Sequence, residues 1–280
     1  MTYHQLKAEA EARLREAPDV ENAGFEAETL LLHTASLDRA AFLAKRADDA
    51  PTDVQTRLFE AVERRTAGEP LQYVLGEWEF CGLRMFCGPG CLIPRPETEL
   101  CVEKAIEKLP RGGRFLDLCT GSGCIATAIL KSRPDAVGTA VDLSADALIF
   151  ARKNAAFHKV ESRLTLVCAP LEDFLPDFSP DVIVSNPPYV KTADVDAFPA
   201  PMRREPRLAF DGGPDGLVFY RRIADRYAPL LAPGGSFVLE TGYDTADGVG
   251  SILRSRGLAT ALFPDLAGIP RVCAGKKTNQ

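Results

Sequence analysis

The spacing of apolar residues changes along the chain and divides it into three parts. In residues 1–76, apolar positions recur every three or four residues, so we expect helices there. Residues 77–94 instead carry short β-like runs around Gly82 and the sequence Gly88-Pro89-Gly90, which predicts a hairpin linker. Residues 95–280 alternate strand-length apolar runs with helical patterns. We therefore expect a helical N-terminal domain, a hairpin linker and an α/β domain, in that order.

The third part is the most regular. Strands that alternate with helices predict an open, mostly parallel sheet. Right-handed crossovers bring the carboxyl ends of such strands to one edge, where ligands bind. The expected strands cover residues 114–119, 136–142, 163–168, 181–185, 235–240, 258–263 and 271–274. The expected helices cover residues 97–109, 125–131, 145–157, 217–231 and 246–256.

Composition excludes several classes of protein. The 280 residues include 33 Lys and Arg against 39 Asp and Glu, a net charge of −6, which argues against broad nucleic-acid binding. The 8 Cys form no C-x-x-C pair and there are 3 His, so neither a metal site nor a disulfide framework is expected. The first residues do not resemble a secretory signal, and no apolar run is long enough to cross a bilayer. We expect a cytoplasmic protein with reduced thiols and no membrane partner.

A glycine-rich turn follows the first strand of the α/β part, in Asp117-Leu-Cys-Thr-Gly-Ser-Gly123. Glycine lets a ligand approach the backbone closely. Asp142 ends the next expected strand, where it can accept hydrogen bonds from both hydroxyls of a ribose. The pattern predicts a nucleoside-containing cofactor. NAD is one alternative, because Gly121-x-Gly123-x-x-Ala126 also fits the dinucleotide fingerprint.

A second motif, Asn186-Pro187-Pro188-Tyr189, follows an apolar strand and Ser185. The Asn186 amide oxygen and a neighbouring backbone carbonyl can accept the two N–H groups of a planar nitrogen. The prolines fix the backbone, and the tyrosine ring offers a face for stacking. The motif predicts a clamp for a carboxamide or for the exocyclic amine of a base. S-adenosylmethionine explains this clamp together with Asp117, which could accept a hydrogen bond from the α-ammonium group that NAD lacks.

Together these two motifs resemble the class I S-adenosylmethionine-dependent methyltransferases that modify amide or amino nitrogens. Three further stretches are similar to the peptide chain release factor glutamine methyltransferases, the HemK/PrmC group. They are Gly68-Glu-Pro-Leu-Gln-Tyr-Val-Leu-Gly76, Leu92-Ile-Pro-Arg-Pro-Glu-Thr-Glu99 and Glu205-Pro-Arg-Leu-Ala-Phe-Asp-Gly-Gly-Pro-Asp-Gly216. The resemblance covers nearly the whole chain.

The resemblance implies a Rossmann-like fold with a mostly parallel seven-stranded sheet, and methyl transfer from S-adenosylmethionine to N5 of a glutamine. It implies class I release factors as partners and a monomer, whose helical domain 1–76 docks the partner. A ribosomal-protein glutamine and a nucleic-acid base amine remain alternative substrates. The resemblance assigns catalysis to Asn186, Pro187 and Tyr189, and substrate binding to these residues and Pro188. The cofactor-binding residues that it implies are Asp117, Cys119, Thr120, Gly121, Ser122, Gly123, Asp142, Leu171 and Asn186.

The sequence departs from the family pattern at two places. Cys119 stands where many relatives have the first glycine of the turn, so the ligand is expected to approach less closely there. Pro170-Leu171 replaces an acidic and an aromatic residue, so Leu171 is expected to cover the adenine, with Glu172 or Asp173 as alternative hydrogen-bonding groups.

Two features have more than one interpretation. Arg95 and Glu97 either close the cofactor pocket or form a surface ion pair. The Pro-rich loop over residues 198–214 is either a mobile lid or a plain connector.

Overall fold

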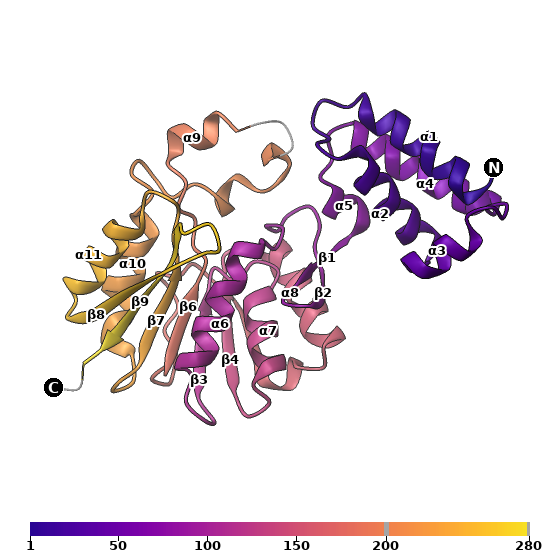
Figure 1. The fold of residues 1–280 in the computed structure, drawn as a ribbon. Coiled ribbons are helices and arrows are strands. Elements are labelled where there is room, and N and C mark those ends of the chain that lie inside the picture. The colour runs from indigo at the N-terminus through magenta and orange to yellow at the C-terminus, as the bar shows by residue number, and fades with distance from the viewer. Residues whose placement is uncertain (199–201, 279–280) are drawn as a thin grey trace. The chain divides into compact units, whose positions relative to one another are not determined.

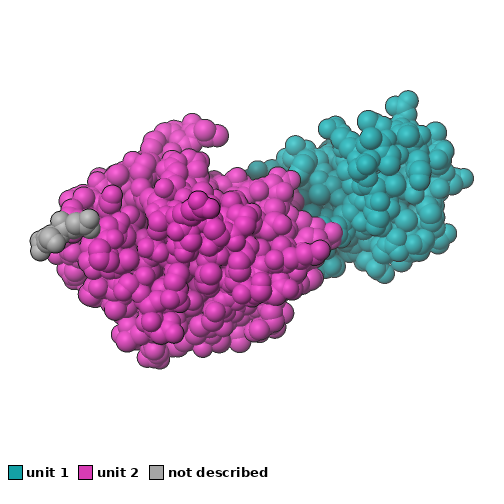
Figure 2. Space-filling model, turned by 90° about the horizontal axis from the view of Figure 1, so that it is seen from below, with its two compact units in different colours: residues 1–77, 199–204 teal, residues 78–198, 205–280 magenta. Residues whose placement is uncertain are grey.

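The structure is a computed structural model that describes residues 1–198 and 202–278 (Figure 1). The chain divides into two compact units, coloured separately in Figure 2. The first comprises residues 1–77 together with 202–204, and the second comprises residues 78–198 and 205–278.

The first unit is helical. Its helices are α1 (Tyr3–Arg15), α2 (Ala23–Ala35), α3 (Arg39–Lys45), α4 (Thr52–Thr66) and α5 (Leu71–Leu75). The apolar spacing that predicted helices is confirmed in α1, where Leu6, Ala10 and Leu14 are fully buried. The spacing did not reveal α3 and α5, because 7 and 5 residues are too few to show a period.

A two-stranded hairpin, β1 (Glu77–Phe80) and β2 (Leu83–Phe86), follows the helices. Cys81 and Gly82 form its turn with φ values of 52° and 67°, which is the left-handed conformation that tight hairpins require. The buried Asn154 side chain anchors β2: it accepts a hydrogen bond from the Phe86 N–H at 2.7 Å and donates one to the Phe86 carbonyl at 3.0 Å. The same amide group donates to the Ser122 carbonyl at 2.9 Å, so Asn154 joins the hairpin to the glycine-rich turn.

The second unit contains a seven-stranded sheet in the order β5-β4-β3-β6-β7-β9-β8. Its strands are β3 (Arg114–Leu118), β4 (Val137–Asp142), β5 (Leu164–Cys168), β6 (Val182–Ser185), β7 (Ser236–Glu240), β8 (Leu258–Pro264) and β9 (Pro270–Lys277). The pairs from β5 to β7 are parallel, and β9 pairs antiparallel with both β7 and β8. The expected Rossmann-like, mostly parallel seven-stranded sheet is confirmed.

Helices cover both faces of the sheet: α6 (Glu99–Lys108), α7 (Cys124–Ser132), α8 (Ala145–Phe157), α10 (Val218–Tyr227) and α11 (Ala246–Arg254). The short helix α9 (Thr192–Asp196) belongs to the segment that follows β6. Figure 1 shows α6, α7 and α8 on one face and α10 and α11 on the other. No helix among residues 1–198 and 202–278 is both long and apolar enough to cross a membrane.

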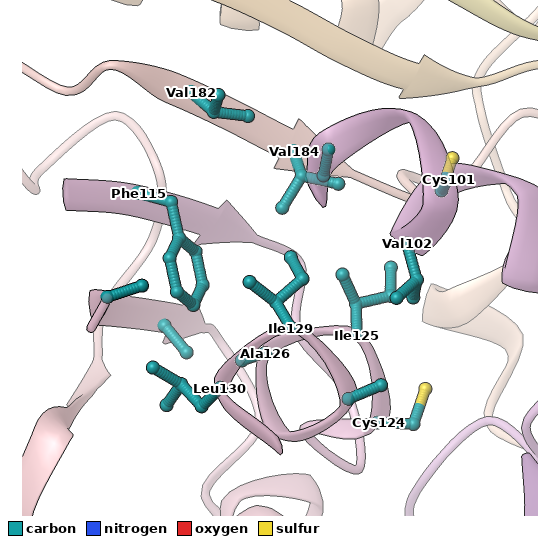
Figure 3. Packing of buried hydrophobic residues seen from close by; sticks show 14 of the residues in the cluster. Cys101, Val102, Phe115, Cys124, Ile125, Ala126, Ile129, Leu130, Val182 and Val184 are labelled. Atoms are coloured by element: carbon teal, nitrogen blue, oxygen red, sulfur yellow. The ribbon is translucent and has the colours of Figure 1, made fainter. Parts of the chain in front are cut away.

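Side chains along the central strands alternate between the two faces of the sheet, so each face has its own hydrophobic core. Phe115, Val182 and Val184 point to the face covered by α6 and α7, as Figure 3 shows. Their neighbours Leu116 and Ile183 point to the opposite face and pack with residues of α10 and α11. Both faces are therefore buried, which explains the nearly continuous apolar runs in these strands.

The order in which strands are added to the sheet reverses between β3 and β6, although these two strands are parallel. From β3 the chain continues outward to β4 and β5, and it then returns to pair β6 with the other side of β3. The carboxyl ends of β3 and β6 therefore separate two sets of loops, and such a switch point leaves a crevice above the sheet. The hydrogen bond from Ser185 Oγ to the Leu118 carbonyl, 2.6 Å long, ties the two strand ends together.

Two expected helix boundaries are wrong. The helix expected over residues 217–231 ends at Tyr227 and continues as a 3₁₀ turn, Ala228–Leu230, because Pro229 lacks an N–H and obstructs the preceding turn. The helix expected from residue 97 is preceded by the 3₁₀ turn Pro96–Thr98, and α6 itself begins at Glu99.

Candidate functional site

A cavity of about 200 Å³ lies at the switch point of the sheet, within the second unit. Most of the residues expected to bind cofactor or substrate line it: Cys119, Thr120, Gly121, Ser122, Asp142, Leu171, Asn186 and Pro188. Asp117, Gly123, Pro187 and Tyr189 lie outside this lining. The fold thus brings the glycine-rich turn and the Asn-Pro-Pro-Tyr motif to one cavity, although they are far apart in the sequence.

The glycine-rich turn is connected to β4 through Asp142. The Gly121 N–H donates to Asp142 Oδ2 at 2.7 Å, and the Ser144 N–H donates to Asp142 Oδ1 at 2.8 Å. Burial raises the pKa of Asp142, and these backbone hydrogen bonds oppose the rise. Two backbone groups therefore fix the carboxyl group at the cavity wall, where lone pairs remain for a further donor.

The glycines of the turn serve different purposes. Gly121 has a φ of 55°, and no heavy atom lies within 4 Å of the position that a Cβ would take. Gly123 has a φ of 73°, and its Cβ would lie 2.9 Å from the Ala151 Cβ of α8. Gly121 therefore leaves open space for a ligand, whereas Gly123 permits close packing between the turn and α8.

Cys119 takes the left-handed conformation without being glycine, with a φ of 58°. Its side chain lines the cavity, and burial raises the pKa of its thiol. The thiol is therefore a neutral, apolar part of the cavity wall.

Asp117 is completely buried behind the turn. Its Oδ2 accepts a hydrogen bond from Thr120 Oγ1 at 2.5 Å, and burial raises the pKa of Asp117 to about 7. Its Oδ1 has no hydrogen-bond partner among the described residues. A buried carboxyl oxygen without a donor marks a place where a donor from a ligand would be favourable.

Asn186 directly follows β6 at the opposite wall of the cavity. Its Nδ2 donates a hydrogen bond to Thr98 Oγ1 at 3.1 Å. No residue in the described part of the chain donates to its Oδ1. The side chain therefore has an acceptor oxygen available at the cavity wall.

Tyr189 faces away from the cavity, toward β7. Its hydroxyl group donates to Glu240 Oε1 at 3.2 Å, and its Cδ2 lies 3.0 Å from the position of a Cβ on Gly242. Burial raises the pKa of Tyr189, so the phenol stays protonated and acts as a donor. Glycine at position 242 thus leaves room for the ring.

Sequence reasoning did not identify Thr98 and Glu240. Glu240 is fully buried, and burial raises its pKa to about 7, while the neighbouring hydroxyl groups of Thr98 and Tyr189 oppose the rise. The available signal was the acidic residue that ends the apolar strand Ser236–Glu240, one strand away from Asn186. Thr98 lies in a stretch that carried the family resemblance, but the sequence does not show where its hydroxyl group points.

Glu205 connects two loops of the cavity wall. This carboxyl group is 5% exposed, accepts a hydrogen bond from the Ile93 N–H at 2.9 Å and pairs with Arg95. Of the two interpretations of Arg95 and Glu97, these contacts favour the first for Arg95, which lines the cavity and pairs with Glu205.

The Pro-rich loop over residues 198–214 contributes to the same wall. Pro206, Leu208 and Ala209, which follow Glu205, line the cavity. Residues 199–201 lie outside the described residues, so the choice between lid and connector stays open for that stretch.

The region expected to hold an adenine is mostly apolar. Leu171 is buried and lines the cavity beside Phe219. Glu172 also lines it and forms an ion pair with Arg222, with a distance of 2.8 Å between Oε1 and Nη1. Of the two alternative hydrogen-bonding groups, Glu172 is at the cavity and Asp173 is not in its lining.

Across residues 1–198 and 202–278, no group of three or more His, Cys, Asp or Glu side chains is arranged to hold a metal ion. The polar groups of the site are instead the Asp142 carboxyl group, the backbone of the glycine-rich turn and the Asn186 amide.

The fold is that of the class I methyltransferases, and the similarity to relatives places the chain in this class of enzymes, which take a methyl group from S-adenosylmethionine. A solved methyltransferase from Pyrococcus furiosus has the same fold, with a TM-score of 0.54 and 17% identity, covering 81% of this chain and 100% of that one. Residues 5–76 match the family model described as the PrmC N-terminal domain, and residues 97–201 match the methyltransferase small domain.

Curated relatives narrow the class to one family. The release factor glutamine methyltransferase of Koribacter versatilis is 40% identical over 94% of both chains. That of Moorella thermoacetica is 40% identical over 97% of both chains. The chain belongs to the release factor glutamine methyltransferase family, which confirms the resemblance found in the sequence.

Proposed function

We propose that this chain transfers a methyl group from S-adenosylmethionine to the side-chain nitrogen N5 of the glutamine in the Gly-Gly-Gln motif of class I release factors. The observation that carries the proposal is the free Oδ1 of Asn186, which lies in the cavity that also contains Gly121 and Asp142. An amide acceptor next to a nucleoside-type site suits transfer to an N–H group. The names of the curated relatives supply the release factor as the substrate.

The residues of the cavity fit S-adenosylmethionine. Asp142 would accept hydrogen bonds from the ribose hydroxyls, since its carboxyl group is already fixed by two backbone donors. Leu171 would cover the adenine, and the unpartnered Oδ1 of Asp117 would accept a hydrogen bond from the ammonium group. The turn residues Cys119, Thr120, Ser122 and Gly123 would complete the binding site, together with Gly121 and Asn186. When bound, the cofactor supplies an electrophilic methyl group on a sulfonium.

The Asn-Pro-Pro-Tyr motif would hold the substrate amide. Asn186 Oδ1 and the Pro187 carbonyl would accept its two N–H groups, and Pro188 would pack against it. Tyr189, expected from the sequence to stack on the amide, would instead hold the motif in place through Glu240. These contacts fix the direction of the nitrogen lone pair, and positioning of this kind contributes up to roughly 7–11 kcal/mol in the best intramolecular systems. A dedicated base is not needed, because the nitrogen becomes acidic once it carries the methyl group.

Each part of the chain would have its own role. Residues 1–76 would dock the release factor, residues 77–94 would form the linker between the two domains, and residues 95–280 would catalyse methyl transfer. The match of residues 5–76 to a family-specific model supports the first assignment. We also infer that the enzyme acts as a monomer in the cytoplasm. Direct nucleic-acid binding is not expected, since acidic residues outnumber basic ones by 39 to 33.

Labelled methyl transfer to a purified class I release factor tests the proposal. We expect one label per release factor, and none in a release factor whose Gly-Gly-Gln glutamine is replaced by alanine. Label in that variant would contradict the proposal. Label that entered only DNA, or only a ribosomal protein, would replace it with one of the alternative substrates.

A further inference from the structure

Three elements meet behind the Asn-Pro-Pro-Tyr motif. Ser185 of β6 pairs with Leu239 of β7, so the next residues, Asn186 and Glu240, leave adjacent parallel strands side by side. Helix α6 packs on both strands, and Thr98 immediately precedes it. Three side chains that are distant in the sequence are thus brought to one point.

Two hydrogen bonds connect side chains at this point. Asn186 Nδ2 donates to Thr98 Oγ1 at 3.1 Å. Tyr189 donates to Glu240 Oε1 at 3.2 Å. Thr98 is 2% exposed and Glu240 is 1% exposed, so water does not compete for these contacts.

The bond to Thr98 determines which end of the Asn186 amide faces the cavity. A threonine hydroxyl oxygen has two lone pairs with which to accept, and Thr98 uses one for the Asn186 NH₂ group. The amide oxygen of Asn186 then faces away from Thr98.

We propose that Thr98 is a positioning residue that fixes the orientation of the Asn186 amide and so makes the site specific for a group that donates N–H bonds. This inference rests on the proposed function. In the fixed orientation, Asn186 presents an acceptor to the substrate, which suits the NH₂ of glutamine and disfavours the carboxylate of glutamate. Rotation of the amide by 180° would present a donor instead and weaken this distinction.

Thr98→Val tests the role, because valine keeps the shape of threonine and removes the hydroxyl group. We expect kcat for methyl transfer to fall roughly 10-fold or more, the loss that corresponds to one orienting hydrogen bond. Thr98→Ser, which restores the hydroxyl group, should recover most of kcat. The calorimetric Kd for S-adenosylmethionine should stay within about twofold of the unaltered enzyme in both variants.

A matched control is available in Thr127 of α7. It is fully buried, its hydroxyl group has no partner in the described part of the chain, and it does not line the cavity. Thr127→Val makes the same chemical change away from the motif and should leave kcat unchanged. Thr98→Ala is measured in parallel and would replace Thr98→Val if valine prevents folding.

Substrate preference distinguishes orientation from mere packing. Binding of release factor with Gly-Gly-Gln is compared with binding of its Gln→Glu variant. The preference for glutamine should fall about fivefold or more in Thr98→Val, and remain in Thr98→Ser and Thr127→Val. A folded Thr98→Val enzyme with unaltered kcat and preference would overturn this inference alone. Failure of the unaltered enzyme to label the release factor would overturn the proposed function.

Discussion

The two walls of the cavity are built by different means. At the ends of β3 and β4, backbone N–H groups hold Asp142, and the partners lie 21 and 2 residues away. At the ends of β6 and β7, side chains hold one another: Asn186 bonds to Thr98, 88 residues away, and Tyr189 to Glu240, 51 residues away. The first wall therefore depends on a local backbone conformation, whereas the second depends on the assembled tertiary structure.

If the second wall mainly positions the substrate, removing the Asn186 amide should affect methyl transfer far more than cofactor binding. We expect Asn186→Ala to lower kcat on the order of 10³-fold, comparable with the loss of one aligned polar group in other enzymes. Single-turnover methyl transfer measures the loss, and calorimetry with S-adenosylmethionine provides the control. An unchanged turnover number would disprove the role of Asn186.

In the first wall, substitution of the two glycines separates the effect of packing from the effect of backbone conformation. Gly123→Ala should lower the free energy of unfolding by about 3 kcal/mol, since a left-handed φ disfavours alanine and its Cβ would lie 2.9 Å from Ala151 Cβ. Gly121→Ala meets no neighbour within 4 Å and should cost only about 1 kcal/mol, from its φ alone. Urea unfolding measures both. Equal losses would show that packing against α8 does not decide between the two glycines.

Asp142→Ala should weaken cofactor binding at the first wall without changing the groups of the second wall that position the substrate. Losing two hydrogen bonds from the ribose to a carboxylate should raise the Kd for S-adenosylmethionine on the order of 100-fold. At saturating cofactor, kcat should change little, because the groups around Asn186 are unaltered. Tight calorimetric binding by the variant would contradict the ribose assignment.

The second wall contains a buried carboxyl group whose effect on stability depends on pH. Burial raises the pKa of Glu240 from 4.5 to about 7, so the folded state binds its proton more tightly than the unfolded state. Its contribution to stability is therefore complete below pH 4.5 and is lost as the pH rises through about 7.

Glu240→Gln removes this titration. Relative to the variant, the unaltered enzyme should lose about 3 kcal/mol of unfolding free energy between pH 4.5 and pH 8. Urea unfolding at several pH values gives the difference. Asp117, whose pKa is also raised by burial, is present in both proteins and cancels. A difference that did not vary with pH would show that Glu240 titrates normally.

The contrast between the walls also explains what the sequence could predict. The glycine-rich turn and Asp142 are local motifs, and the sequence predicted a cofactor site from them. The structure brings both to the wall of one cavity. Asn186 was predicted because its neighbours are two prolines and a tyrosine. Thr98 and Glu240 were not, since a single threonine or a glutamate at the end of a strand has many possible roles. The pairing of Arg95 with Glu205 was not predicted either, because these residues are far apart in the sequence and near only in space.

The position of β9 has a consequence for the synthesis of the protein. This last strand is inserted between β7 and β8 and pairs Val272 with Glu240. A ribosome releases the chain from its N-terminus, so the glycine-rich turn can assemble while the strand that completes β7 is still inside the exit tunnel. The substrate side of the site would then be the last part to mature.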